Sequence, residues 1–312
     1  MRITKPKTIL DANIVSCNVP ENDYAIYSSI ATYNLGDLVI VTGTDIHQIY
    51  MSVHAANIGN NPLSDNQSSP AHWSLQGATN KYKMLDSYVS SQTVYADSIQ
   101  LTLQNLGQLN TVSLLNTNGK TATVTVTRTT DNAVIYNTTK SLISTAGRDS
   151  FWHWFFNPVL NRNNVTFSDI PPSYNSVVAM SIDNVGFNVK LGHVVVGNGV
   201  QFNRFTDAAN NSVNYGASVR NRDYSVKTRL STGDYYFKQG ATAKDGNFTF
   251  QIPNSQYDLL ITTIADIGSA PALFTATNIF DSTNIYGLLV DAEPVINYPG
   301  YSDVNLKIEG LI

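Results

Sequence analysis

The clearest pattern along the chain is a strict alternation of polar and apolar residues. Over residues 121–127, Thr occupies every second position, with Ala or Val between. A period of two places neighbouring side chains on opposite faces of a β-strand. Weaker alternation continues from about residue 80 to residue 225, interrupted by turns rich in Gly, Asn and Pro. This succession of short strands predicts a jelly-roll-like β-sandwich over residues 81–225.

A small separate β module is expected before the sandwich, over residues 23–80. Residues 37–53 have the pattern of a β-hairpin around a Thr-Gly-Thr-Asp turn. A unit of this size needs aromatic burial to be stable. Tyr33, Tyr50 and Trp73 are available for that role.

The two ends of the chain differ from these central segments. Residues 1–22 contain scattered apolar positions and prolines, and we expect an arm that is mobile or lies on a neighbour, which includes a neighbouring subunit. Residues 226–312 predict a β-rich region with one helix near residues 255–267, because apolar residues recur there at helical spacing: Tyr257, Leu260, Ile261 and Ile264. The fold class expected for the whole chain is therefore mainly β.

Composition narrows the classes of partner. Charged residues make up 13% of the chain and the net charge is -4, against the roughly 25% charged residues that are usual. Without clustered Lys and Arg, we expect no nucleic-acid partner. The absence of an apolar run of about 20 residues argues against a membrane partner, and a single cysteine, Cys17, cannot form an internal disulfide.

Patterns that carry chemistry are missing from the sequence. The five histidines lack metal-ligand spacing, and no nucleophile motif surrounds a serine or Cys17. Asp291 and Glu293 are two positions apart on an expected strand, where solvated charges are favoured over a glycosidase pair. The Gly192–Gly199 segment lacks phosphate-loop spacing. We therefore expect no enzyme, no catalytic residue, no metal site and no cofactor.

The aromatic run over residues 151–156, Phe-Trp-His-Trp-Phe-Phe, is the most unusual segment. On a strand, both faces would be aromatic. Such a strand favours burial in a core or at a subunit interface. The alternative is a stacking platform for sugar rings, which requires Trp152 or Trp154 to face solvent.

Two stretches resemble known families. Residues 33–39, followed by Tyr50, the Gly59–Pro62 turn and Trp73, resemble small chitin-binding-type carbohydrate-binding modules, although the leading Trp of those modules is absent here. The continuation from Trp73 to Asp86, with its Gly-Ala-Thr-Asn segment, resembles an element of bacteriophage structural proteins in which such a module is fused to a β-sandwich.

The resemblance implies a non-enzymatic component of the phage tail, neck or baseplate, assembled in the host cytoplasm. Its partners would be other copies of itself and other virion proteins. The alternatives are a glycan-binding adhesin that recognises host surface polysaccharide, and a polysaccharide hydrolase. The candidate glycan-contact or interface aromatics are Tyr33, Tyr50, Trp73, Trp152 and Trp154.

Overall fold

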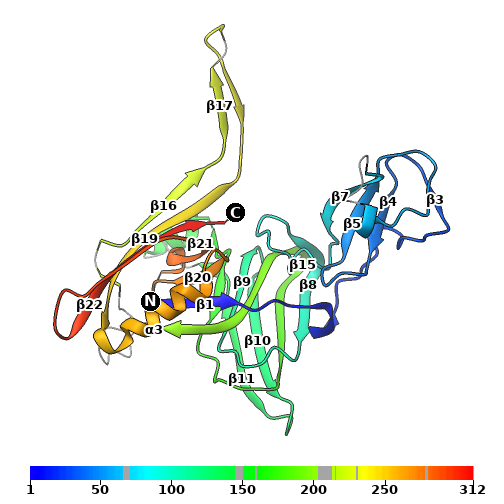
Figure 1. Cartoon of the computed structure of the whole chain (residues 1–312). Helices are drawn as coiled ribbons and strands as arrows, with labels where there is room; N and C mark the ends of the chain where they lie inside the picture. The colour runs from blue at the N-terminus through cyan, green and yellow to red at the C-terminus, as the bar shows by residue number, and fades with distance from the viewer. Residues whose placement is uncertain are drawn as a thin grey trace. The chain divides into compact units, whose positions relative to one another are not determined.

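The computed structural model describes residues 1–65, 71–144, 150–158, 160–202, 213–214, 216–229, 231–277 and 280–311. Antiparallel strands predominate, so the mainly β prediction is confirmed (Figure 1). Two compact units are present: unit 1 comprises residues 1–7, 109–112 and 195–312, and unit 2 comprises residues 8–108 and 113–194. Neither unit begins or ends near residue 225, where the sequence predicted a domain boundary. Within the described ranges, no helix has the length and apolarity needed to cross a bilayer.

Unit 2 contains most of the short elements. They are η1 (Asp11–Asn13), β2 (Ile14–Cys17), β3 (Thr32–Tyr33), β4 (Leu38–Val41), β5 (Gln48–Ser52), β6 (Asn57–Ile58), α1 (Pro62–Asp65), β7 (Trp73–Ala78), β8 (Thr93–Leu103), β10 (Thr121–Arg128), β11 (Val134–Ser141), β12 (Ile143–Ser144), α2 (Phe151–Phe156), β13 (Leu160–Asn161) and β14 (Val165–Phe167). The strands β9 (Thr111–Thr117) and β15 (Ser176–Gln201) contribute residues to both units.

The small module of unit 2 is built on a three-stranded sheet in the order β4-β5-β7. Leu38 pairs with Met51 and Val41 with Gln48, so the hairpin expected over residues 37–53 is confirmed. A separate two-stranded pairing joins β3 to β6.

The remainder of unit 2 contains a sheet in the order β11-β10-β15-β8-β2. Strand β10, which lies between β11 and β15, has the alternation predicted from sequence. Ala122, Val124 and Val126 are fully buried, while Thr123 on the other face hydrogen-bonds through its Oγ1 to Thr139 Oγ1 at 2.8 Å. Burial of one face and cross-strand Thr pairing on the other explain why this register is stable.

Unit 1 contains the long C-terminal strands. Its elements are β1 (Arg2–Pro6), β16 (Ser218–Asp223), β17 (Val226–Arg229), β18 (Tyr235–Lys238), β19 (Thr242–Pro253), η2 (Asn254–Gln256), α3 (Tyr257–Ile267), β20 (Ala272–Thr275), η3 (Asp281–Thr283), β21 (Asn284–Val295) and β22 (Tyr301–Gly310). The sheet order is β15-β1-β20-β21-β22-β19-β16, and every pairing in it is antiparallel.

The first residues of the expected arm do lie on a neighbour, which is the same chain. Strand β1 inserts between β15 and β20, with Ile3 opposite Val200 and Phe274. Ile3 is 1% exposed, and Lys5 Nζ lies 2.8 Å from Asp266 Oδ1 at the end of α3. Backbone pairing on both sides supplies the stability that such a short segment lacks alone.

The core of unit 1 lies between its sheet and α3. Phe248, Phe250 and Ile252 are alternate residues of β19 and are fully buried, together with Leu260 of α3. The helix near residues 255–267 is therefore confirmed, with η2 forming its first turn.

Candidate interaction surfaces

The three aromatic candidates of the small module form its core. Trp73 is 2% exposed and Tyr50 is 3% exposed, and both pack with Val39 and Val41. Tyr33 is half-buried, and its ring lies edge-on to Trp73 at a centroid distance of 5.1 Å. Edge-to-face packing of this kind stabilises small aromatic clusters.

Trp73 is also fixed by its polar atom. Its Nε1 donates a hydrogen bond of 2.9 Å to the carbonyl oxygen of Asn60, and Tyr27 packs against its ring edge-on at 5.8 Å. Because its side chain is almost completely buried, Trp73 offers no open surface on which a sugar ring would stack.

The aromatic run over residues 151–156 is a helix, α2, so the prediction of a strand there was wrong. Ser150 caps the helix, since its Oγ accepts a hydrogen bond from the backbone N–H of His153. Asn157 follows the last helical residue in an extended conformation. The polar cap favours the helix over the preference of aromatic residues for β-structure, which depends on context.

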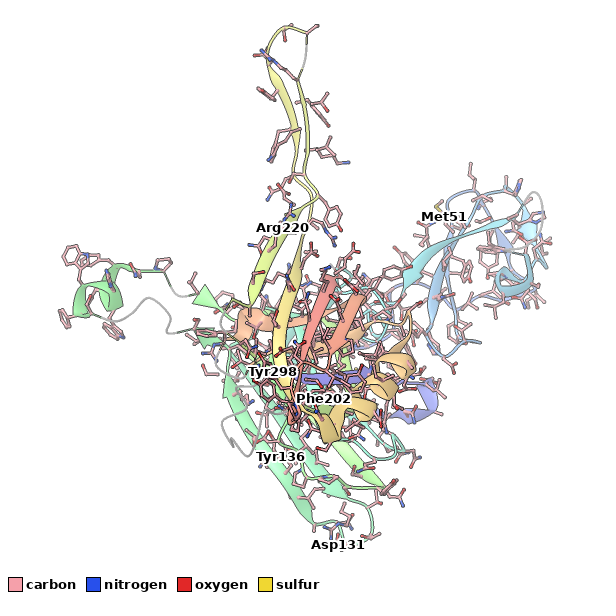
Figure 2. All side chains as sticks on the ribbon, turned by 60° about the vertical axis from the view of Figure 1, so that its left-hand side comes forward. Met51, Asp131, Tyr136, Phe202, Arg220 and Tyr298 are labelled. Atoms are coloured by element: carbon pink, nitrogen blue, oxygen red, sulfur yellow. The ribbon has the colours of Figure 1, made fainter. Side chains whose placement is uncertain are left out.

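All six side chains of α2 are exposed. Trp152 is 67% exposed and Trp154 is 57% exposed. The rings contact mainly one another. The ring centroids of Trp152 and Phe156 are 4.1 Å apart, and their ring planes are inclined by 37°. Figure 2 shows the ring-bearing side chains of this short helix spreading outward in several directions. A cluster of exposed aromatic residues on this scale is typical of a surface that another molecule covers.

A second exposed apolar surface was not recognised from sequence. Among the strands that the structure describes, β17 and β18 form a two-stranded sheet of their own, and we call residues 224–229 and 231–240 the aromatic hairpin. Every residue of both strands is exposed, including Tyr235, Tyr236 and Phe237 at 69%, 55% and 57%. The signal was present in the sequence, because three consecutive aromatic residues place rings on both faces of a strand.

The base of the aromatic hairpin is held by ion pairs. Arg222 on β16 lies 2.6 Å from Glu309 Oε1 and 3.4 Å from Asp245 Oδ1. The same arginine borders a polar cavity of about 340 Å³ between β16, β19 and β22. Because two carboxylates already neutralise this guanidinium, the cavity offers little net charge for binding an anion.

The Gly-Ala-Thr-Asn segment connects the small module to strand β8. Asn80 Oδ1 accepts from the backbone N–H of Val94 at 3.0 Å, and its Nδ2 donates to the Val94 carbonyl at 2.9 Å. The following residues Tyr82 and Met84 are fully buried. The Gly-Ala-Thr-Asn segment therefore anchors the module to the sheet.

Polar side chains beside this segment make internal contacts. His47 Nδ1 lies 2.8 Å from Glu21 Oε1, which also accepts from the Thr79 hydroxyl at 3.0 Å. Tyr82 donates to Asp11, and burial raises the pKa of the Cys17 thiol. A thiol that resists ionisation is a poor nucleophile.

A metal site would require several ligating side chains to converge on one point. Over the part of the chain that the structure describes, no group of three or more His, Cys, Asp or Glu residues converges in a way that would hold a metal ion. Asp291 instead forms an ion pair of 2.8 Å with Lys307.

Known proteins provide no further guidance. Comparison with family models and with curated proteins gives no match for this chain. The class of this protein is therefore the one that its own features define: a mainly β chain of two units with prominent exposed aromatic surfaces.

Proposed function

We propose that the chain is a non-enzymatic structural component of a phage particle, located in the tail, neck or baseplate and assembling through protein–protein contacts. The observation that carries the proposal is the exposure of large apolar side chains on two separate elements, α2 and the aromatic hairpin. Neither element has a core of its own. An isolated two-stranded hairpin is marginally stable in water, and exposed aromatic clusters mark contact surfaces.

The phage assignment within this class has separate support. It comes from the resemblance of residues 73–86 to a phage structural element, and Asn80 and Tyr82 of that segment have clear structural roles as an anchor. A subunit of a symmetric assembly would bury strand edges and aromatic surfaces against its neighbours.

Mass spectrometry of particles tests the proposal directly. Particles of the phage whose genome encodes this chain are purified on a density gradient and digested. Peptides of this chain are expected at a constant ratio to the major capsid protein through the particle peak. If capsid and tail peptides are found while those of this chain are absent, the structural role is wrong.

The second candidate is a glycan-binding adhesin, and one observation favours it. Trp152 and Trp154 face solvent, as a sugar-stacking platform requires. The test is a glycan array probed with the full chain and with a variant that combines Trp152→Ala and Trp154→Ala. Binding by the wild type that the double variant loses supports the adhesin, and an array without binding removes it.

A further inference from the structure

Unit 1 carries a second exposed surface whose charge is opposite to that of the aromatic hairpin. We call residues 290–303 the acidic turn. It comprises the loop between β21 and β22 together with the last residues of β21 and the first residues of β22. The turn contains Asp291, Glu293 and Asp303 and no basic residue, and because Asp291 is paired with Lys307 at 2.8 Å, Glu293 and Asp303 carry most of its negative charge. It also exposes large apolar side chains: Val290 at 62%, Val295 at 41%, Ile296 at 62% and Tyr298 at 48%.

The acidic turn is held in one conformation. Asn254 Nδ2 donates hydrogen bonds of 3.0 Å to the backbone carbonyls of Tyr298 and Pro299. The rings of Tyr298 and Tyr301 stack at a centroid distance of 4.4 Å. A surface that is already ordered loses little conformational entropy when it binds a partner.

The aromatic hairpin has the complementary character. Lys227, Arg229 and Lys238 outnumber its single acid, Asp234, giving a net charge of +2 against -4 for the whole chain. Its exposed apolar residues are Tyr224, Val226, Tyr235, Tyr236 and Phe237. Together these side chains expose on the order of 500 Å², a large part of the roughly 800 Å² that each partner buries in a standard interface.

One copy cannot bring its own two surfaces together. The aromatic hairpin continues from the end of β19 at which Thr242 pairs with Asp223. The tip of the acidic turn lies at the other end, where Pro253 pairs with Tyr301, while Asp291 pairs with Lys307 nearer the middle of the sheet. The residues of β19 between these ends span about 36 Å at the usual rise per residue. The hairpin points away from the turn in Figure 1 and in Figure 2, where Tyr298 is labelled.

Contact between two hairpins is also disfavoured, because it would bring six cations together. We infer that the aromatic hairpin of one copy docks on the acidic turn of a second copy of this chain. The contact is head-to-tail and joins two different surfaces, so successive copies form a ring or an open chain. This inference rests on the proposed structural role and adds the partner and the two surfaces that meet.

Two variants of the full chain test the inference. A hairpin variant carries Arg229→Glu and Lys238→Glu, and a turn variant carries Glu293→Lys and Ile296→Ser. All four positions are exposed. Sedimentation velocity over roughly 1 µM to 1 mM covers weak and moderate association. The wild type is expected to self-associate, and each variant to do so at least roughly tenfold more weakly, because like charges then face each other.

Mixing the variants separates a head-to-tail contact from other modes. The hairpin variant keeps an intact turn and the turn variant keeps an intact hairpin, so their mixture is expected to associate although each variant alone does so only weakly. A control variant carries Lys120→Glu and Lys190→Glu at exposed positions of unit 2. Its net charge changes by the same amount as that of the hairpin variant, and it is expected to associate like the wild type. Circular dichroism melts confirm that every variant is folded.

Three outcomes overturn the inference: a wild type that stays monomeric over the whole range, folded variants that still associate normally, or a mixture that associates no better than each variant alone. None of these outcomes bears on the presence of the chain in particles. Conversely, association through these surfaces by a protein that is absent from particles would retain the contact and remove the phage role.

Discussion

Trp73→Ala is expected to unfold the small module while the rest of the chain stays folded. Trp73 is 2% exposed and packs in a small cluster with the buried residues Val39, Val41 and Tyr50. Truncating a buried Trp to Ala costs about 3–5 kcal/mol. Loss of the indole bond to Asn60 adds about 1 kcal/mol.

The expected loss is comparable to the whole stability of the module. At roughly 0.05–0.15 kcal/mol per residue, a unit of about 60 residues is stable by about 3–9 kcal/mol. Unfolding should therefore remain local, because β10 and its partner strands keep their own buried face.

Limited proteolysis followed by mass spectrometry measures this directly. In Trp73→Ala, cleavage is expected throughout residues 23–80, with a protected fragment that begins near β8. Trp152→Ala serves as the matched control, since its side chain is 67% exposed and its loss should leave both the cleavage pattern and the melting temperature unchanged. A Trp73→Ala protein whose module resists protease as well as the wild type would refute the proposed core.

Three further predictions concern other parts of the structure. Asn80→Ala removes both hydrogen bonds to Val94 and should lower the free energy of unfolding by about 2 kcal/mol in chemical denaturation; an unchanged midpoint would contradict the anchoring role. Burial lowers the pKa of His193 from 6.5 to about 4. Between these pH values the imidazole is therefore protonated in the unfolded chain and neutral in the folded chain. Stability should therefore fall by up to about 3 kcal/mol as the pH drops from 6.5 to 4, and His193→Gln should flatten this part of the calorimetric pH profile. A Cβ at Gly192 would lie 2.4 Å from a backbone carbonyl oxygen, whereas one at Gly300 would meet nothing within 4 Å; Gly192→Ala should lower the melting temperature by the equivalent of about 1–3 kcal/mol, and Gly300→Ala should have little effect.

The sequence predicts local structure best where one face of an element is buried. The Thr and Val alternation of β10 and the helical spacing of α3 each reflect a single covered face, and both predictions are confirmed. For residues 151–156 the composition was aromatic on every side, so periodicity carried no information about the partner surface. There the capping by Ser150 determined the outcome.

The candidate surfaces were predicted only in part. The dependence of a small module on aromatic burial placed Tyr50 and Trp73 together, but the same reasoning could not show that the Trp73 ring is closed to solvent. The exposure of the aromatic hairpin was not predicted, because the sequences of its two strands resemble those of ordinary strands. Only tertiary structure reveals that β17 and β18 pack against no second layer.

The alternation of buried residues along β19 constrains how this protein can change its dimensions. Phe248, Phe250 and Ile252 point into the core, and a one-residue insertion between them would turn the following side chains to the opposite face. Viable length changes in this strand therefore come in pairs of residues, or about 7 Å at a time. If copies join as proposed, the spacing between neighbouring subunits can vary among related assemblies only in discrete steps of that size.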